Sequence, residues 1–402
     1  MYRCSALIIA LFMTLCFTRA AWSEAPFHIG LVTGTELQGT DEIDGAEAVI
    51  KEYGLLKDGG YIVHVMYVDE FMDDMEETIN LIASLADDPK MKVIVVNQAI
   101  PGTSAAFKRV YQKRPDIIML AGEPHEDPDE IVDAAPANVF LAVGVDNVNR
   151  GYTIPYAAQM LKAKKFVHIS FPRHMSYETL RRRKAIMQAA SEKLGLEFHA
   201  EEAPDPIESI GIEGARAFIE KAIPRWLEKY GKETAFFCTN DAHTEPLIKG
   251  LLQYGGLFPE ADLPSPLMGY PGALGLEIQE RAGDNWPAIV KQVEDAVLAA
   301  NGSGRFGTWS FSYGYATTAG LAEFGKRVVE GSARIDSLSD LQTCYEKYTP
   351  GADWSTAFYT NAETGQAYKQ YALVYQDTYI FGLGYLGLTQ IEIPEEYYTI
   401  SE

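Results

Sequence analysis

The side chains best suited to chemistry in this chain are polar groups that directly follow short apolar runs. They comprise hydroxyls, amides, carboxylates and one guanidinium, together with two aromatic rings. The candidates for a ligand site are Thr33, Gly34, Thr35, Gln98, Glu123, Asp146, Phe171, Arg173, Asn240, Asp241 and Tyr270. Such donors and acceptors suit a small polar solute. Asp146, Asn240 and Asp241 have an alternative role, because the same residue types cap helices.

Sequence motifs for catalysis, metals and cofactors do not occur. The chain has no G-x-S-x-G elbow, no P-loop and no histidine pair at the spacing of a helical zinc site. G-x-G-x-x-G occurs at 302–307 and 382–387, but neither copy stands between a strand and a helix of a βαβ unit. The acids at 127–130 lack the alternate ligands and the glycine of a calcium loop. We therefore expect a binding protein with no catalytic residues, metal or cofactor, and not an enzyme.

Apolar runs and helical patterns alternate along the chain, which is typical of parallel sheets with helical crossovers. In the first part we expect strands at 27–32, 61–68, 92–96, 117–121 and 139–145, and helices at 46–53, 75–86 and 107–111. In the second we expect strands at 166–171, 234–238, 266–270 and 308–312, and helices at 155–163, 177–194, 215–230, 247–254, 288–300 and 317–329. The fold class is thus α/β, with two doubly wound parallel-sheet lobes. The candidate residues follow strand ends, the edge at which open α/β sheets bind ligands.

Charge and the N-terminus indicate an exported protein. The 402 residues include 34 Lys and Arg against 56 Asp and Glu, a formal charge of −22, which argues against a nucleic-acid partner. Arg3, the apolar run at 5–17 and small residues before a cut after Ala20 have the layout of a secretory signal peptide at 1–20. Lipid attachment at Cys16 is the alternative. Later apolar segments are too short to span a membrane.

Four parts are expected along the chain. The signal peptide precedes a first lobe at 26–149 plus about 310–335, a second lobe at 150–309, and an aromatic-rich extension at 336–402 with a strand at 371–381. The thirteen aromatic residues between 345 and 398 either pack on the two lobes or form a patch for a partner or ligand. Cys238 and Cys344 follow the signal region, and for Cys238 we favour a buried thiol over a disulfide.

The segment Thr234–Gly256 resembles the strand, Asn-Asp pair, helix and glycine of type I periplasmic solute-binding proteins. In this resemblance Asn240 and Asp241 match the family's ligand-facing pair, and 146–151 looks like its crossover into the second lobe. Arg182 occupies the place of an Arg-x-x-Gly-Phe helix, with an alanine instead of the glycine. The run at 269–272 stands where sugar-binding members have Gly-x-Asp-Gly, and it lacks the aspartate.

Four further segments look like a functionally uncharacterised family of secreted bacterial proteins with this fold. They are "VTGTELQGTDE", "IVVNQAIPGT", "FVHISFPRHMS" and "GKETAFFCTN". The looser resemblance to type I binding proteins covers roughly residues 26–330, and the aromatic segment has no counterpart in it.

The resemblance implies two lobes joined by crossover strands, with a ligand in the cleft and a hinge motion that closes it. We expect Arg173 to pair with an anionic or carbonyl group, and Glu123 and Asp241 to accept from hydroxyl or amino groups. Phe171 and Tyr270 would stack on a flat ring. The expected function is capture of a small polar solute for the membrane permease of an ABC transporter. An exported sensor that presents its ligand to a membrane receptor is the alternative, and an exported enzyme is a third possibility.

Overall fold

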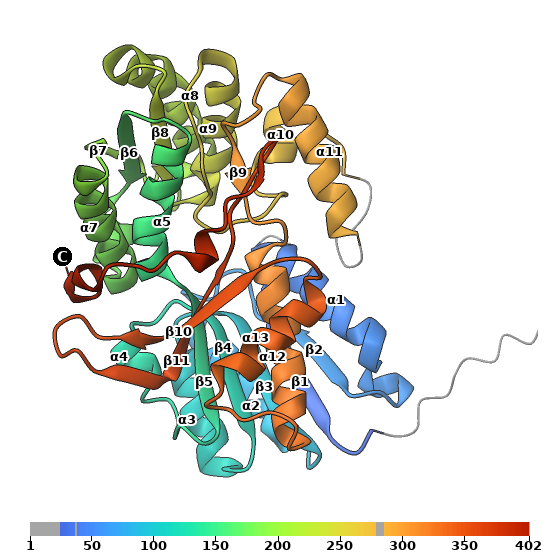
Figure 1. The fold of residues 1–402 in the computed structure, drawn as a ribbon. Helices are drawn as coiled ribbons and strands as arrows, with labels where there is room; N and C mark the ends of the chain where they lie inside the picture. The colour runs from blue at the N-terminus through green and yellow to red at the C-terminus, as the bar shows by residue number, and fades with distance from the viewer. Residues whose placement is uncertain (1–24, 37, 279–284, 402) are drawn as a thin grey trace, which may run out of the picture.

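The structure is a computed structural model that describes residues 25–36, 38–278 and 285–401. The expected signal peptide at 1–20 and the lipid-attachment alternative at Cys16 lie outside the described residues. The described chain forms two α/β lobes, one above the other in Figure 1. The expected α/β fold class with parallel-sheet lobes is confirmed. Within the described part of the chain, no helix is long and apolar enough to cross a bilayer.

The first lobe is built on a seven-stranded sheet in the order β10-β11-β5-β4-β3-β1-β2. Its strands are β1 (His28–Thr33), β2 (Ile62–Met66), β3 (Met91–Ala99), β4 (Ile118–Pro124), β5 (Phe140–Val145), β10 (Trp354–Thr360) and β11 (Ala367–Gln376). All neighbouring pairs are parallel except β10 with β11. The central strands are buried almost throughout, as expected for a sheet covered on both faces.

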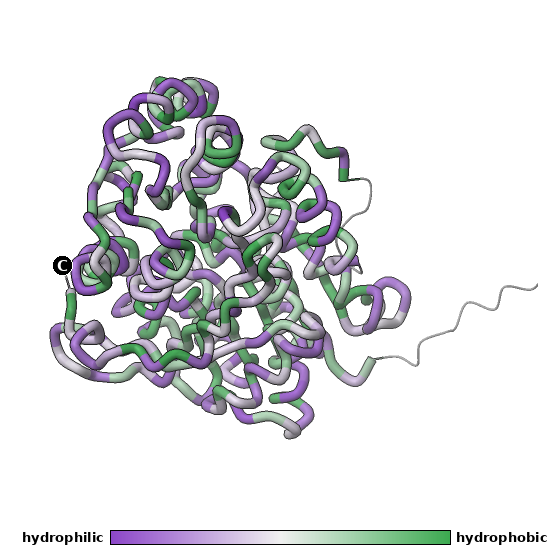
Figure 2. Tube along the Cα trace, turned by 45° about the horizontal axis from the view of Figure 1, so that its top comes forward, coloured by the Kyte–Doolittle hydropathy of each residue, from purple (hydrophilic) through white to green (hydrophobic). Residues whose placement is uncertain are grey.

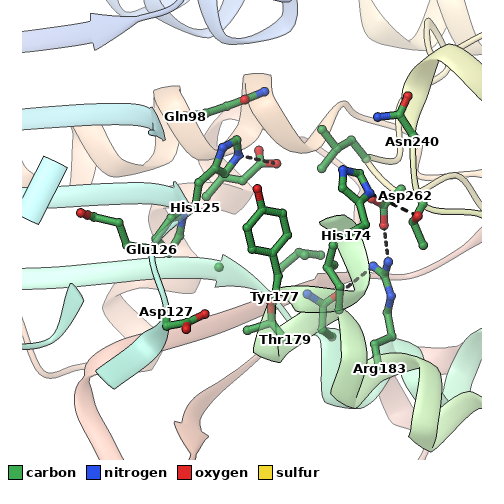
Figure 3. A pocket seen from close by; sticks show the side chains of 18 of the residues that line it. Gln98, His125, Glu126, Asp127, His174, Tyr177, Thr179, Arg183, Asn240 and Asp262 are labelled. Carbon is green, nitrogen blue, oxygen red and sulfur yellow. Dashed lines mark hydrogen bonds and ion pairs between the residues drawn. The ribbon is translucent and has the colours of Figure 1, made fainter. Parts of the chain in front are cut away.

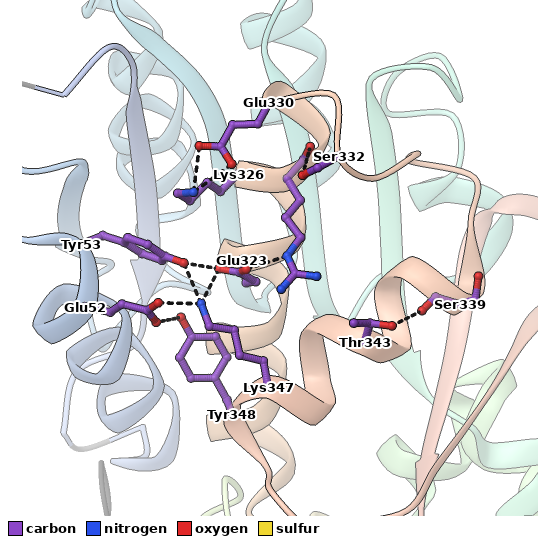
Figure 4. Close-up of polar contacts among 11 residues, drawn as sticks. Glu52, Tyr53, Glu323, Lys326, Glu330, Ser332, Ser339, Thr343, Lys347 and Tyr348 are labelled. Atoms are coloured by element: carbon purple, nitrogen blue, oxygen red, sulfur yellow. Dashed lines mark hydrogen bonds and ion pairs between the residues drawn. The ribbon is translucent and has the colours of Figure 1, made fainter.

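Helices cover this sheet and hold the later part of the chain against it. They are α1 (Asp41–Tyr53), α2 (Met75–Ser84), α3 (Thr103–Lys113), α4 (Pro128–Ile131), α12 (Tyr313–Val329) and α13 (Leu338–Tyr348). Helix α12 lies on β3 and β4, between α1 and α13. Lys347 Nζ of α13 lies 2.7 Å from Glu52 Oε1 of α1 and 2.9 Å from Glu323 Oε2 of α12 (Figure 4). These ion pairs fix α13 to the first lobe.

The second lobe has a smaller parallel sheet in the order β7-β6-β8, with β6 (Lys165–Ser170), β7 (Glu197–Glu202) and β8 (Thr234–Cys238). Its helices are α5 (Asn147–Met160), α6 (Pro172–Ser176), α7 (Glu178–Lys193), α8 (Gly211–Tyr230), α9 (Asp241–Tyr254), α10 (Tyr270–Leu274) and α11 (Trp286–Ala299). Figure 2 shows hydrophilic residues prominent on the outer helices of this lobe. Cys238 and Cys344 are both buried free thiols.

Three expectations for individual strands differ from the structure. Residues 266–269 form a loop and Tyr270 begins α10, because Pro264 and Pro266 cannot donate the hydrogen bonds of a ladder. At 308–312 only β9 (Gly307–Thr308) pairs as a strand, while the Phe311 amide donates to the Gln376 side chain. Strand β7 was not expected, because its sequence EFHAEE holds few apolar residues.

Three segments connect the lobes: β5 to α5, β9 to α12, and β11 to β12 (Tyr379–Ile380) (Figure 1). A buried ion pair lies beside them, with Arg150 Nε of α5 2.7 Å from Glu260 Oε1 and neither side chain exposed. Glu260 Oε2 also accepts from Trp309 Nε1 at 3.1 Å and from the Thr378 hydroxyl at 2.7 Å. One carboxylate thus bonds to residues next to all three connections.

The residues after 336 are built into both lobes. Strands β10 and β11 complete the first sheet, and β12 joins β9 and β13 (Gly384–Tyr385) in a small antiparallel sheet. Arg182 of α7 bonds to this part of the chain, because it donates to the carbonyl oxygens of Thr360, Tyr398 and Ile400 at 2.7–3.0 Å. Most aromatic side chains of this segment are buried, whereas Tyr385 and Tyr398 are exposed.

Candidate functional site

A cavity of about 260 Å³ lies between the lobes, at the carboxyl ends of the first-lobe strands. Its first wall comes from the ends of β3, β4 and β5, and its second wall from α6, α7 and the start of α9 (Figure 3). A second cavity of about 300 Å³ lies beside the starts of α1 and α12. We refer to them as the interlobe pocket and the acidic compartment. They share five lining residues, so they adjoin: Gln38, Gln98, Glu123, Asp241 and Leu263.

The structure brings five of the eleven candidate residues into the interlobe pocket. These five are Gln98, Glu123, Arg173, Asn240 and Asp241. The other six lie outside the linings of both cavities, and they are Thr33, Gly34, Thr35, Asp146, Phe171 and Tyr270. The interlobe pocket thus lies at the sheet edge where the candidates were expected, but following a strand is not enough to put a side chain into a cavity.

The candidates after β1 shape a loop instead of lining a cavity. The Thr33 hydroxyl lies 2.9 Å from His64 Nε2, and the Thr35 hydroxyl donates to Asp69. A Cβ atom at Gly34 would lie 2.7 Å from the Gln38 Cβ, so only glycine allows this close approach. The loop then returns toward the cleft, where Gln38 lines both cavities.

Both aromatic candidates are enclosed by the second lobe, which corrects the expectation that they stack on a ligand. Tyr270 is fully buried, and its hydroxyl donates to the Gly307 carbonyl at 2.7 Å. Its ring packs edge-on against Phe381, with 5.1 Å between the centroids. Phe171 is 2% exposed and lies beneath the imidazole of His174, with 4.2 Å between the ring centroids. Each ring contributes to the core, as large apolar side chains usually do.

Arg173 lines the interlobe pocket, but its charge is already paired. Its Nε and Nη2 atoms lie 2.7 and 2.9 Å from the two carboxylate oxygens of Asp205, which is a bidentate ion pair. The expected pairing of Arg173 with an anionic ligand group therefore competes with a partner inside the protein. Asp205 is 5% exposed, so breaking this pair would leave a buried carboxylate without its cation.

The helix-capping alternative holds for two candidates. Asp146 accepts a hydrogen bond from the Asn149 amide at 2.8 Å at the start of α5, and burial raises the pKa of its carboxyl to about 6. Asn240 accepts from the Ala242 amide at 3.0 Å at the start of α9, and it also lines the pocket. Asp241 is the first residue of α9 and lines both cavities.

The second wall of the interlobe pocket presents groups that sequence reasoning missed. Arg183 lies 2.6 Å from Asp262 and donates to Asn147 Oδ1 at 2.8 Å. Burial lowers the pKa of His174 to about 4, so its imidazole is neutral at pH 7. The phenol of Tyr177 points into the pocket between His125 and His174 (Figure 3). Arg183 carries no sequence signal, because nothing in a helical pattern distinguishes a pocket arginine from a surface one.

The acidic compartment is dominated by carboxylates. Its lining includes Glu36, Asp41, Glu42, Glu123 and Asp241, and its described lining residues include no Lys, Arg or His. Sequence reasoning missed the acids at 41 and 42, because acids in the first turn of a helix are ordinarily explained by the helix dipole. Only the folded chain brings this turn next to β4.

Burial and mutual repulsion raise the pKa of several of these acids. For Glu42 the loss of water acts most strongly, the charges of Glu123 and Asp41 add to it, and the pKa rises to about 8. Burial likewise raises the pKa of Glu123. Asp241 is more exposed than Glu42 and Glu123. Desolvation by the surrounding protein, and then the charges of nearby acids, still raise the pKa of its carboxyl. In the described residues no group of three or more His, Cys, Asp or Glu could hold a metal ion.

Two comparisons with other sequences identify relatives. Residues 27–307 match the model of a family described as "Protein of unknown function (DUF3798)", and residues 318–400 match a second family model. An uncharacterized protein of Treponema pallidum (strain Nichols) is 42% identical over 217 residues, which cover 54% of this chain and 96% of that protein. A second uncharacterized protein of the same strain is 40% identical over 182 residues, covering 45% of this chain and 80% of that protein.

Solved structures with the same fold belong to proteins that are described as having different functions. A protein from Clostridium difficile 630, described as a "Putative transcriptional regulator", has a TM-score of 0.75 at 21% identity, over 88% of this chain and 99% of that one. The substrate-binding protein of a sugar ABC transport system from Bordetella parapertussis 12822 has a TM-score of 0.53 at 10% identity, over 94% and 95%. A solute-binding protein from R. palustris in complex with 4-hydroxybenzoate has a TM-score of 0.51 at 12% identity, over 88% and 92%.

At these identities the structural likeness establishes the fold and carries no activity. It confirms the two-lobe fold expected from the resemblance to solute-binding proteins. The family follows from the sequence match, which spans well over half of the chain. By that match this chain belongs to the DUF3798 family of proteins of unknown function.

Proposed function

We propose that this protein is an extracytoplasmic binding protein that captures a small solute between its lobes and delivers it to the permease of an ABC importer. The observation that carries this proposal is that the interlobe pocket takes its walls from both lobes. A solute bound there contacts both lobes at once and therefore favours their closed arrangement. The signal-peptide pattern at 1–20 supports an extracytoplasmic location.

The fold gives the proposal further support. Two solved proteins with this fold are described as ABC transporter solute- or substrate-binding proteins, and one of them holds a small aromatic acid. We do not propose an enzyme, because the sequence carries no motif for a nucleophile, a metal or a cofactor. An exported sensor would use the same pocket. Loss of solute uptake in cells that lack the gene would favour import over sensing.

A thermal-shift panel tests the binding function. The protein is unfolded and refolded to remove bound molecules, then heated with sugars, nucleosides, amino acids, amines and carboxylates. A ligand at a thousand times its Kd adds about 4 kcal/mol of stability, which raises Tm by about 5 °C in a chain of this size. We expect one chemical class to act, and Asp241→Asn to weaken it about tenfold or more.

The matched control for that variant is Asp336→Asn, which removes the same charge from an exposed residue outside the cleft. It should leave the affinity unchanged. A panel with no response, together with a native mass spectrum of the freshly purified protein that shows no bound small molecule, would overturn the binding function. Equal weakening by both variants would place the ligand outside the cleft.

A further inference from the structure

We infer that the cleft holds its solute through a protonated amine seated in the acidic compartment, so that the ligand is a small organic cation. This inference rests on the proposed binding function and adds the charge class of the ligand. It follows from the charge balance of the cleft, from one carboxylate oxygen without a partner, and from the size of the cavity.

The charges around the cleft are balanced on one side only. In the second lobe Arg173 pairs with Asp205, and Arg183 pairs with Asp262. In the acidic compartment Asp41, Glu42, Glu123 and Asp241 face a cavity of about 300 Å³ whose described lining contains no basic side chain. Closing the lobes over this compartment would remove water from its carboxylates. With a neutral solute these acids could avoid unbalanced charge only by holding protons, whereas a cation would balance the charge of the ionised carboxylates.

Glu123 shows where the cation would donate. This residue is 9% exposed, it lines both cavities, and its Oε2 atom is buried without a hydrogen-bond partner among the described residues. Its other oxygen lies 3.9 Å from His125 Nε2, which is too long for a hydrogen bond. Buried carboxylate oxygens are normally bonded. An ammonium group offers three N–H donors and a positive charge, and so it suits this position.

The neighbouring acid supports the same conclusion. Glu42 is buried, its Oε1 accepts from Gln98 Nε2 at 3.3 Å, and its pKa is raised to about 8 by burial and by the charges of Glu123 and Asp41. In the free protein a proton therefore relieves the repulsion between these acids at neutral pH. A bound ammonium would replace that proton and do the same. The acids are too dispersed for a metal ion, and the cavity has room for an organic molecule.

Matched pairs of solutes test the charge of the ligand. Putrescine is compared with butanediol and glucosamine with glucose, because the members of each pair are similar in size and differ in two ammonium groups and one ammonium group, respectively. We expect the amines to raise Tm and the neutral partners to leave it unchanged. Glu123→Gln and Glu42→Gln should each weaken amine binding by about tenfold to a hundredfold in titration calorimetry. Glu363→Gln is the control, because it removes the same charge from an exposed turn between β10 and β11.

The outcomes separate this inference from the binding function. If a neutral or anionic solute raises Tm while the amines do not, the ligand is not a cation and the binding function stands. If amines bind equally well to Glu123→Gln and Glu42→Gln, they bind outside the acidic compartment and the inference is wrong. If no solute of any class binds, the binding function fails together with it. Melting curves of the free variants verify that each one folds.

Discussion

Glu260→Gln should destabilise the protein strongly, because it leaves a buried guanidinium without a counter-charge. Arg150 and Glu260 are fully buried and 2.7 Å apart, and three donors converge on the Glu260 carboxylate. The amide of glutamine has the same shape, but its NH2 end cannot accept from the donor that it meets. Removing one partner of a buried ion pair costs about 3–5 kcal/mol.

The unfolding entropy, which scales with chain length, determines how far this loss of free energy lowers Tm. At about 2.1 cal/mol/K per residue, the unfolding entropy of 402 residues is about 0.8 kcal/mol/K. A loss of about 3–5 kcal/mol then lowers Tm by about 4–6 °C. Calorimetry on the wild type and on Glu260→Gln measures this shift directly.

Two further variants separate the unpaired charge from the loss of shape. Arg150→Met combined with Glu260→Gln removes the buried charge altogether, and it should recover at least half of the lost Tm. Glu330→Gln removes the same charge from an exposed pair with Lys326 and should lower Tm by about 1 °C or less (Figure 4). A single variant that melts within 1 °C of the wild type, or a double variant that is no better, would refute the reasoning.

Three more predictions test individual side chains. Tyr270→Phe leaves the Gly307 carbonyl unbonded, so it should cost about 1–3 kcal/mol in urea unfolding without changing ligand affinity; a large loss of affinity would return Tyr270 to the site. Asn240→Ala removes a helix cap and should lower the free energy of unfolding by about 1 kcal/mol, whereas Asn240→Asp should keep most of that stabilisation. The Glu42 pKa is about 8 in the folded protein against an ordinary 4.5, so the folded state holds the additional proton and stability falls as pH rises through this window. In urea titrations from pH 5 to 8, Glu42→Gln should show a shallower decline, by up to about 1.4 kcal/mol per pH unit, and an unchanged slope would contradict the raised pKa.

The strands of the first sheet were predictable as far as local pattern decides them. The apolar runs that became β1, β3, β4 and β5 are short, continuous and separated by helices, which is enough to indicate buried parallel strands. The pairing of β11 with β5 was not predictable. It joins Tyr371–Val374 to Ala142–Val145 across more than two hundred residues, and nothing in the periodicity of either strand identifies the other.

The sequence predicted that the candidate residues lie at the sheet edge, but it did not predict which charged residues pair with them. Glu123 lies at the end of β4 and Asp241 follows β8, so their positions at the sheet edge could be inferred. The pairing of Arg173 with Asp205 could not, because it depends on a loop after β7 that approaches α6 only in the folded protein. The expectation that Tyr270 faces a ligand differs from the structure for a related reason. The segment before it is a loop and not a strand, and its side chain is buried in the core.

Partner assignment is what distinguishes the acids around the cleft from one another. Glu260, Asp205 and Asp262 each have an arginine within 2.7 Å, so these carboxylates are already balanced inside the protein. Glu42 and Glu123 have no arginine among their ion pairs in the described residues: Glu42 accepts from the Gln98 amide, and Glu123 lies 3.9 Å from His125. A formal charge of −22 says nothing about this division, because composition counts acids without their partners. The unequal pairing, and not the excess of acids, is therefore the reason to look for a cation in this cleft.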